Sequence, residues 1–159
     1  MASKANLSIG SSISSVHYQN DRADLAARIR ALRPESARQW GKMTVIQMLE
    51  HCQLFDRWIQ SGEPNRQTLM GKLVGRAVLR RMLRPDKAMA RNVPTMPALM
   101  SPGGTEFSAA QAAWLTSLEA YADYEADVFV HDFFGPLSYD ELGAFVWKHA
   151  DHHLKQFRA

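Results

Sequence analysis

Three histidines lie within five residues near the end of the chain, in the segment VWKHADHHLKQF at residues 146–157. A neutral imidazole binds a divalent metal through a ring nitrogen, and two imidazoles four residues apart on a helix can reach one ion. His149 and His153 have this spacing and share the apolar face of a helix, whereas His152 falls at its margin. The pattern predicts a metal-binding pair; a partly exposed pair at a frayed helix end is the alternative.

A metal site that keeps an open position for catalysis needs a third protein ligand. His51, in the segment MLEHCQLF, is the candidate, because it lies on the apolar arc of a second predicted helix. A lone histidine in this setting is also explained as a core residue with its own hydrogen-bond partner. We predict a mononuclear site formed by His51, His149 and His153. Participation of His152 and His131 stays open.

The composition restricts the class of protein. A chain of 159 residues with 46% hydrophobic and 22% charged residues matches one globular domain. The single cysteine, Cys52, excludes an intramolecular disulfide, fits a reducing compartment and is expected to be a small buried residue. No apolar run approaches the roughly 18 residues that span a bilayer. We therefore expect a soluble, cytoplasmic protein without a membrane partner.

The histidines have to be positioned by amphipathic helices. Helical periodicity covers four segments, at residues 20–32, 45–60, 108–121 and 138 to the C-terminus. Thr44, Ser108 and Ser138 are the expected N-caps, each with a Gln or Glu three residues later. No segment shows a sustained alternation of apolar and polar residues with a period of two, so we expect no sheet. This predicts an all-α four-helix bundle with up-down-down-up order and a long crossover between helices 2 and 3. Residues 1–18 are expected to form a flexible leader and residues 19–159 a single domain.

The predicted crossover begins with a basic, helix-compatible segment at residues 66–84, followed by a loop of about 20 residues, a length typical of functional loops or lids. The cations of residues 66–84 are expected to be spread around the helix, without interleaved aromatic residues, so nucleic acid is not an expected partner. One question stays open, namely whether an arginine of this segment holds an anionic substrate group over the metal.

The segments GKMTVIQMLEHC, FFGPLS and KHADHHLKQF, together with the long crossover, resemble the DinB/YfiT-like superfamily, in a subfamily of unknown function. The resemblance extends from about residue 31 to residue 157. It implies a four-helix bundle that forms homodimers and binds one divalent metal. The implied ligands are a histidine of the second helix and a His-x-x-x-His pair of the fourth, here His51, His149 and His153. It also implies thiol-dependent S-transferase or metal-dependent hydrolase activity.

The leading hypothesis is a metal-dependent transferase or hydrolase that acts on a small molecule, with a low-molecular-weight thiol as a candidate co-substrate. Zinc or nickel suits imidazole ligands, and either would lower the pKa of a bound water or thiol. The alternative is a non-catalytic bundle that binds a ligand or partner. The sequence assigns no catalytic residue and leaves the substrate, the metal and its presence, and the oligomeric state open.

Overall fold

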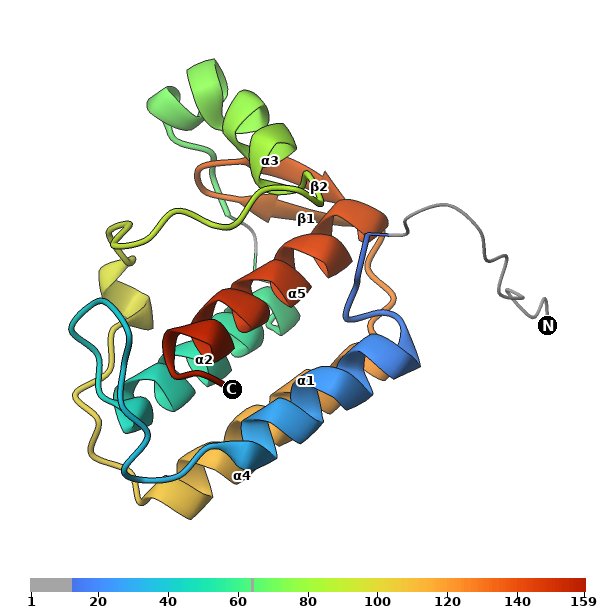
Figure 1. Cartoon of the computed structure of the whole chain (residues 1–159). Coiled ribbons are helices and arrows are strands. Elements are labelled where there is room, and N and C mark those ends of the chain that lie inside the picture. Colours follow the sequence, from blue (N-terminus) through green and yellow to red (C-terminus); the bar gives the residue numbers. More distant parts are fainter. Residues whose placement is uncertain (1–12, 64) are drawn as a thin grey trace, which may run out of the picture.

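Four long helices form the body of the protein in the computed structural model, which describes residues 13–63 and 65–159. They are α1 (Gln19–Ala31), α2 (Val45–Gln60), α4 (Phe107–Glu119) and α5 (Tyr139–Gln156). Helix α2 packs against α4 and α5, and α1 packs against the same two helices, so the hydrophobic core lies between them (Figure 1). No helix within the described residues combines the length and the apolar composition that a membrane span requires.

The N-termini of α2 and α5 have the capping boxes that the sequence predicts. The Thr44 hydroxyl accepts the amide N–H of Gln47, and the Ser138 hydroxyl accepts that of Glu141. The predicted N-cap of the third bundle helix, Ser108, is wrong by two residues. There the carboxylate of Glu106 accepts the amide N–H of Ala109 at 3.1 Å, so α4 begins at Phe107 and Ser108 lies in its first turn.

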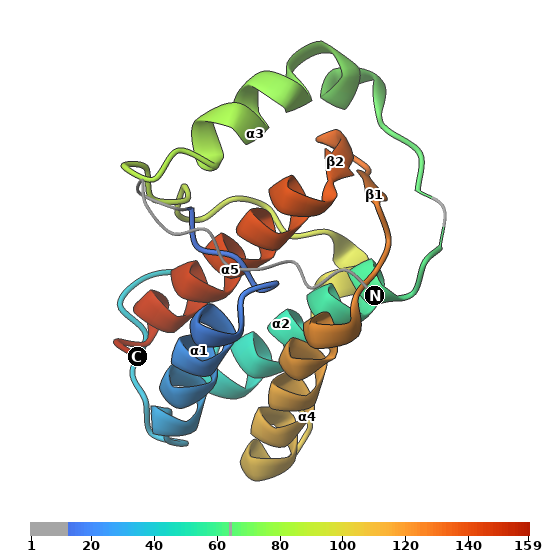
Figure 2. The same cartoon turned by 90° about the vertical axis from the view of Figure 1, so that its right-hand side faces the viewer.

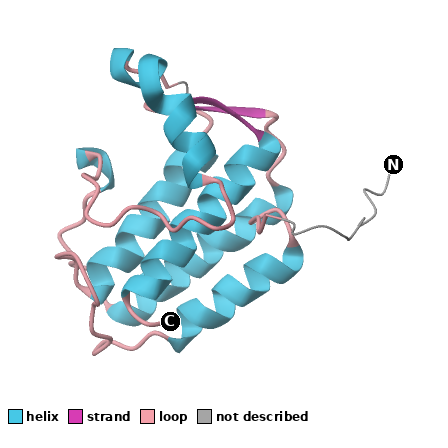
Figure 3. Ribbon diagram, turned by 45° about the horizontal axis from the view of Figure 1, so that its top comes forward, coloured by secondary structure: helices cyan, strands magenta, loops and turns pink. Residues whose placement is uncertain are grey.

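The predicted all-α four-helix bundle is wrong. Within the described residues the chain forms five α-helices and a two-stranded antiparallel sheet, drawn in magenta in Figure 3. Strand β1 (Val128–His131) pairs with β2 (Gly135–Ser138), with Phe129 opposite Leu137 and both side chains buried. Each strand has four residues, too few for an alternating pattern to be recognised in the sequence. Gly135, with φ of +77°, supplies the left-handed conformation at the turn.

The fifth helix, α3 (Arg76–Met82), lies in the crossover and follows the π-helical turn η1 (Gly71–Gly75). A Cβ atom at Gly71 or Gly75 would overlap with the carbonyl oxygen of Phe133, so both glycines let the helix lie directly on the turn between β1 and β2. Beyond α3, the Lys148 ammonium donates to the carbonyls of Arg84 and Lys87, both at 2.6 Å. These bonds fix the end of the basic segment to α5.

Two short 3₁₀ helices complete the connections: η2 (Pro97–Leu99) lies in the loop before α4, and η3 (Ala120–Asp123) continues α4. The predicted flexible leader lies outside the described residues at positions 1–12. From residue 13 onward the chain is described, and Val16 is fully buried, with its amide N–H donating to the Gly143 carbonyl at 3.1 Å. The packed part of the chain therefore begins before residue 19.

Candidate metal centre

Three histidines from two helices meet in the interior of the protein. His51 comes from α2, and His149 and His153 come from α5. Their ligand nitrogens all lie within 4.8 Å of one another, and Nε2 of His51 is 3.2 Å from Nε2 of His149. The side chains are buried, with exposed fractions of 4%, 8% and 7%. The structure thus brings together the three residues that helical spacing selects.

Packing and helix position orient these rings. The spacing of four residues places His149 and His153 one above the other on the buried face of α5, with ring centroids 4.7 Å apart. The ring of Phe55, one turn after His51 on α2, stacks on the ring of His149 at 3.9 Å with an interplanar angle of 25°. Phe55 therefore restricts rotation of His149.

Hydrogen bonds at the far side of two rings fix their tautomers. Nδ1 of His51 lies 2.9 Å from the carbonyl oxygen of Leu99, and because a carbonyl only accepts, this nitrogen carries the proton. Nδ1 of His153 lies 2.9 Å from Oε1 of Gln156. The amide of Gln156 is oriented because its Nε2 donates to the Trp40 carbonyl at 2.9 Å. Nε2 of His51 and Nε2 of His153 therefore carry no proton, and Nε2 of His51 lies at hydrogen-bond distance, 3.2 Å, from Nε2 of His149.

This donor set fits a divalent metal. At a Zn–N distance of about 2.0–2.1 Å, tetrahedral coordination places two ligand nitrogens roughly 3.3 Å apart. The nitrogens of His51 and His149 have about this separation, at 3.2 Å, and the wider set of three lies within 4.8 Å, so the ring of His153 would shift towards the other two to bind the same ion. Within the described residues the group contains only histidines, and nitrogen ligands of this kind suit zinc, nickel, copper or iron better than magnesium or calcium.

Burial keeps the three imidazoles neutral. It lowers the pKa of His51, it lowers the pKa of His153 to about 3, and it lowers the pKa of His149 well below its ordinary value. Neighbouring imidazoles add to this effect, His153 acting on His149 and His51 acting on His153. At neutral pH the ring nitrogens are therefore available to a cation without the prior loss of a proton.

The other candidate residues lie outside this group. His152 is half-buried, with its ring 5.5 Å from the ring of Trp40. His131 is buried at the end of β1, where its Nδ1 accepts the amide N–H of Phe133 at 3.0 Å. The predicted burial of Cys52 is confirmed; its thiol contacts the sulfur of Met48 at 3.8 Å, and burial raises its pKa well above the ordinary value. Cys52 is thus unsuited to act as a thiolate nucleophile.

Part of the long loop before α4 is fastened to α2 beside the histidines. The Leu99 carbonyl accepts a hydrogen bond from His51. The carboxylate of Glu50, the residue before His51 on α2, accepts from the hydroxyl of Ser101 and from the amide N–H of Thr105. Consecutive residues of α2 therefore hold the loop and orient a ring of the cluster.

Two cavities in the described part of the protein have volumes of about 320 and 710 Å³. The smaller lies between the end of α2 and η3, beside Ile59 and Tyr124. The larger lies at the start of α2, beside Val45 and Phe157. None of the three clustered histidines lines either of these two cavities, so neither provides direct access to the centre.

Sequence reasoning did not assign the residues that orient the ligands. Gln156 had a detectable signal, because it follows His153 by three residues and so shares its helix face. The carbonyl of Leu99 had none, since any residue of the loop offers the same group.

The family model described as "Protein of unknown function (DUF1569)" matches residues 11–159. No model of the DinB/YfiT-like superfamily matches, so the family assignment drawn from the resemblance is wrong. No curated protein and no solved structure shows a significant match. The choice of ligands therefore depends on helical spacing and on the geometry of the cluster.

Proposed function

We propose that this chain, which belongs to the DUF1569 family of proteins of unknown function, is a metal-dependent enzyme with His51, His149 and His153 as ligands. The observation that carries the proposal is the fixed direction of two lone pairs. The Leu99 carbonyl and the Gln156 amide oxygen each accept a hydrogen bond from the Nδ1–H of one ring, which leaves Nε2 of His51 and of His153 without a proton. This arrangement favours a cation as their shared partner.

Nitrogen ligands favour zinc or nickel as the ion. Bound by three protein ligands, such an ion would have an open position and would lower the pKa of a coordinated water or thiol. The protein residues supply the remaining conditions. Leu99 and Gln156 keep two rings in one tautomer, Phe55 restricts the third ring, and burial keeps all three neutral. Preorganised ligands of this kind reduce the free-energy cost of assembling the site.

Two reaction classes need this activation: hydrolysis, and transfer of a low-molecular-weight thiol to an electrophilic small molecule. Within the described residues no carboxylate belongs to the cluster, and the thiol of Cys52 is buried with a raised pKa. We therefore place the chemistry in activation of the nucleophile and not in a protein thiolate.

A non-catalytic ligand-binding or partner-binding protein is the second candidate. It is favoured by the burial of the cluster and by the two cavities described above, which the histidines do not line. In this case the metal would join α2 to α5 as a structural link.

Turnover assays separate the two candidates. The protein is stripped with a chelator, reloaded with zinc or nickel, and assayed for hydrolysis of activated esters and for transfer of a small thiol to an electrophile. We expect turnover that depends on metal, that is lost in His149→Ala/His153→Ala and that persists in the matched control His152→Ala. Turnover that survives both chelation and the double substitution contradicts the proposal, and tight metal binding without turnover favours the structural link.

A further inference from the structure

The outer side of the helical segment at residues 69–82 is apolar and exposed. Leu69 and Leu73 have exposed fractions of 81% and 79%, and that of Met70 is 61%. Val74 and Val78 follow, each at 41%. Large apolar side chains are usually exposed singly, so five of them on one continuous helical segment indicate a surface that is covered by a partner.

The inner side of the same segment explains this exposure. Gly71, Gly75 and Leu79 are buried, and the two glycines lie against the carbonyl of Phe133. These three buried positions are four residues apart and lie on one side of the helix. The apolar residues on its other sides therefore point away from the body of the protein. The exposure of the five apolar side chains is therefore maintained by the packing of the inner side and is not a consequence of local unfolding.

The flank of the segment is cationic. Lys72, Arg76 and Arg80 are four residues apart and so share one side of the helix, whereas Arg81 lies on another side. Residues 65–85 contain six cations and no Asp or Glu. Arg76 pairs with Glu141 at 2.6 Å. Within the described residues Lys72, Arg80 and Arg81 form no salt bridge.

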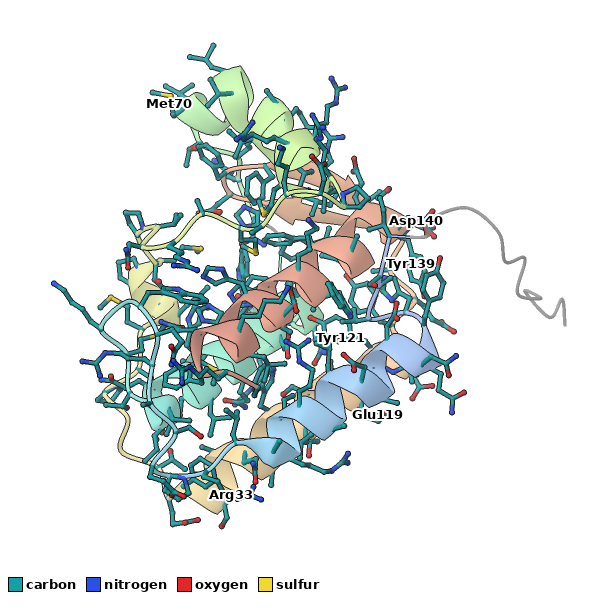
Figure 4. The ribbon with its side chains drawn as sticks, in the orientation of Figure 1. Arg33, Met70, Glu119, Tyr121, Tyr139 and Asp140 are labelled. Atoms are coloured by element: carbon teal, nitrogen blue, oxygen red, sulfur yellow. The ribbon has the colours of Figure 1, made fainter. Side chains whose placement is uncertain are left out.

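The segment lies at an outer edge of the molecule. Figures 1 and 2 show α3 beyond the hairpin and outside the group of α1, α2, α4 and α5. Figure 4 shows Met70 at the far end of this segment, pointing away from the body. A flat partner could therefore contact the segment without touching the long helices.

We propose that the segment at residues 69–82 docks on an anionic lipid surface. Apolar side chains along a helix with a cationic flank match the interface of a bilayer, where the apolar groups enter the boundary of the acyl chains and the cations meet lipid phosphates. Charge complementarity selects this partner, because residues 65–85 contain no acidic residue and, although Arg76 is paired with Glu141, Lys72 and Arg80 form no salt bridge within the described residues.

Other partners fit the surface less well. A stable protein interface uses about 20–30 residues on each side, far more than this patch offers, and antiparallel pairing of two copies would set the cationic flanks against each other. A nucleic acid would leave the apolar side chains in water and find no aromatic residue for base stacking in residues 65–85.

Co-flotation of the full chain with vesicles tests the proposal. Vesicles of phosphatidylcholine are compared with vesicles that also contain phosphatidylserine, at low and high salt. We expect binding to the acidic vesicles that weakens with salt. Two variants probe the two features: Leu69→Ser/Leu73→Ser and Lys72→Glu/Arg80→Glu. Both change exposed side chains. We expect the first to lower the partition coefficient at least about ten-fold, and the second at least about 25-fold, since each cation contributes about five-fold.

The matched control is Arg30→Glu/Lys42→Glu, which makes the same charge change at exposed positions outside this segment and should retain binding. Failure of the native chain to bind acidic vesicles overturns the proposal, as does unchanged binding by either of the two variants. A native dimer that becomes a monomer in Leu69→Ser/Leu73→Ser, without vesicle binding, would instead assign the surface to a second copy. Retention of DNA that only the charge variant loses, again without vesicle binding, would assign it to a nucleic acid.

Discussion

His153 and Gln156 are joined by a hydrogen bond of 2.9 Å in which the imidazole Nδ1–H donates to the amide Oε1. A second hydrogen bond fixes the orientation of this amide, because its Nε2 donates to the carbonyl of Trp40, in the loop before α2. The amide oxygen therefore faces His153. Gln156 therefore couples a loop of the protein surface to the tautomer of a candidate metal ligand.

Replacing Gln156 by leucine keeps the approximate volume of the side chain but removes the acceptor for His153 Nδ1. The ring can then move its proton to Nε2 and rotate, which withdraws the lone pair from the cluster. Loss of such an orienting group typically costs 10–100-fold in metal affinity, and we expect a decrease of about this size. Isothermal titration with zinc measures it.

Gln60→Leu is the matched control for this experiment. Gln60 donates to the Ser117 carbonyl at 2.8 Å, between α2 and α4, and does not contact the three histidines. Its replacement should leave zinc affinity unchanged. Equal affinities for Gln156→Leu and the native chain would show that the tautomer of His153 does not govern binding.

Asp56 is expected to make folding stability depend on pH. The carboxyl is buried between α2 and α4, it accepts from Trp114 Nε1 and from the Tyr121 hydroxyl at 3.1 Å each, and burial raises its pKa to about 8. In the unfolded chain its pKa is about 3.9. Between these values the folded state binds a proton that the unfolded state lacks, so stability falls as pH rises.

The variant Asp56→Asn isolates this effect, since it keeps an acceptor but cannot ionise. We expect the free energy of unfolding of Asp56→Asn, relative to the native chain, to increase with pH between about pH 5 and about pH 8. The slope should approach about 1.4 kcal/mol per pH unit. Urea unfolding across this range measures it. A difference that is constant with pH would mean that Asp56 is already ionised in the folded state.

Gly71 and Gly75 hold the apolar segment against the hairpin, and alanine at either position should loosen it. The added methyl group would overlap with the carbonyl oxygen of Phe133. Because this oxygen belongs to the backbone, the overlap cannot be relieved by rotating a side chain. We expect Gly71→Ala and Gly75→Ala each to destabilise the protein by about 1–3 kcal/mol in thermal or urea unfolding. Gly104→Ala meets no atom within 4 Å and should be nearly neutral. Stabilisation by Gly75→Ala, as helix propensity alone would give, would contradict the described packing.

Helix positions with periodic apolar residues and a capping box could be predicted from the sequence. The starts of α2 and α5 follow from Thr44 and Ser138, and these boundaries set the faces on which the three histidines lie. Since a helix face is a local property, the pair His149 and His153 and its third partner could be chosen without knowledge of tertiary contacts.

Features that depend on tertiary contacts could not be predicted. The hairpin of Val128–His131 and Gly135–Ser138 is too short for its period to be recognised, and its pairing is supported by burial against the core. The start of α4 was misplaced because the carboxylate of Glu106, and not the hydroxyl of Ser108, caps it. The resemblance to another superfamily relied on short segments around the histidines, and it misassigned both the family and the fold.

We propose that His51, His149 and His153 bind one divalent ion, and elemental analysis of the purified protein after reloading with zinc or nickel measures this binding. We expect one equivalent of metal per native chain, the same stoichiometry for His152→Ala, and none for His149→Ala/His153→Ala, with circular dichroism confirming that each variant is folded. A native chain that takes up no zinc and no nickel, or a folded double variant that still holds one equivalent, would show that these three histidines do not form the metal site.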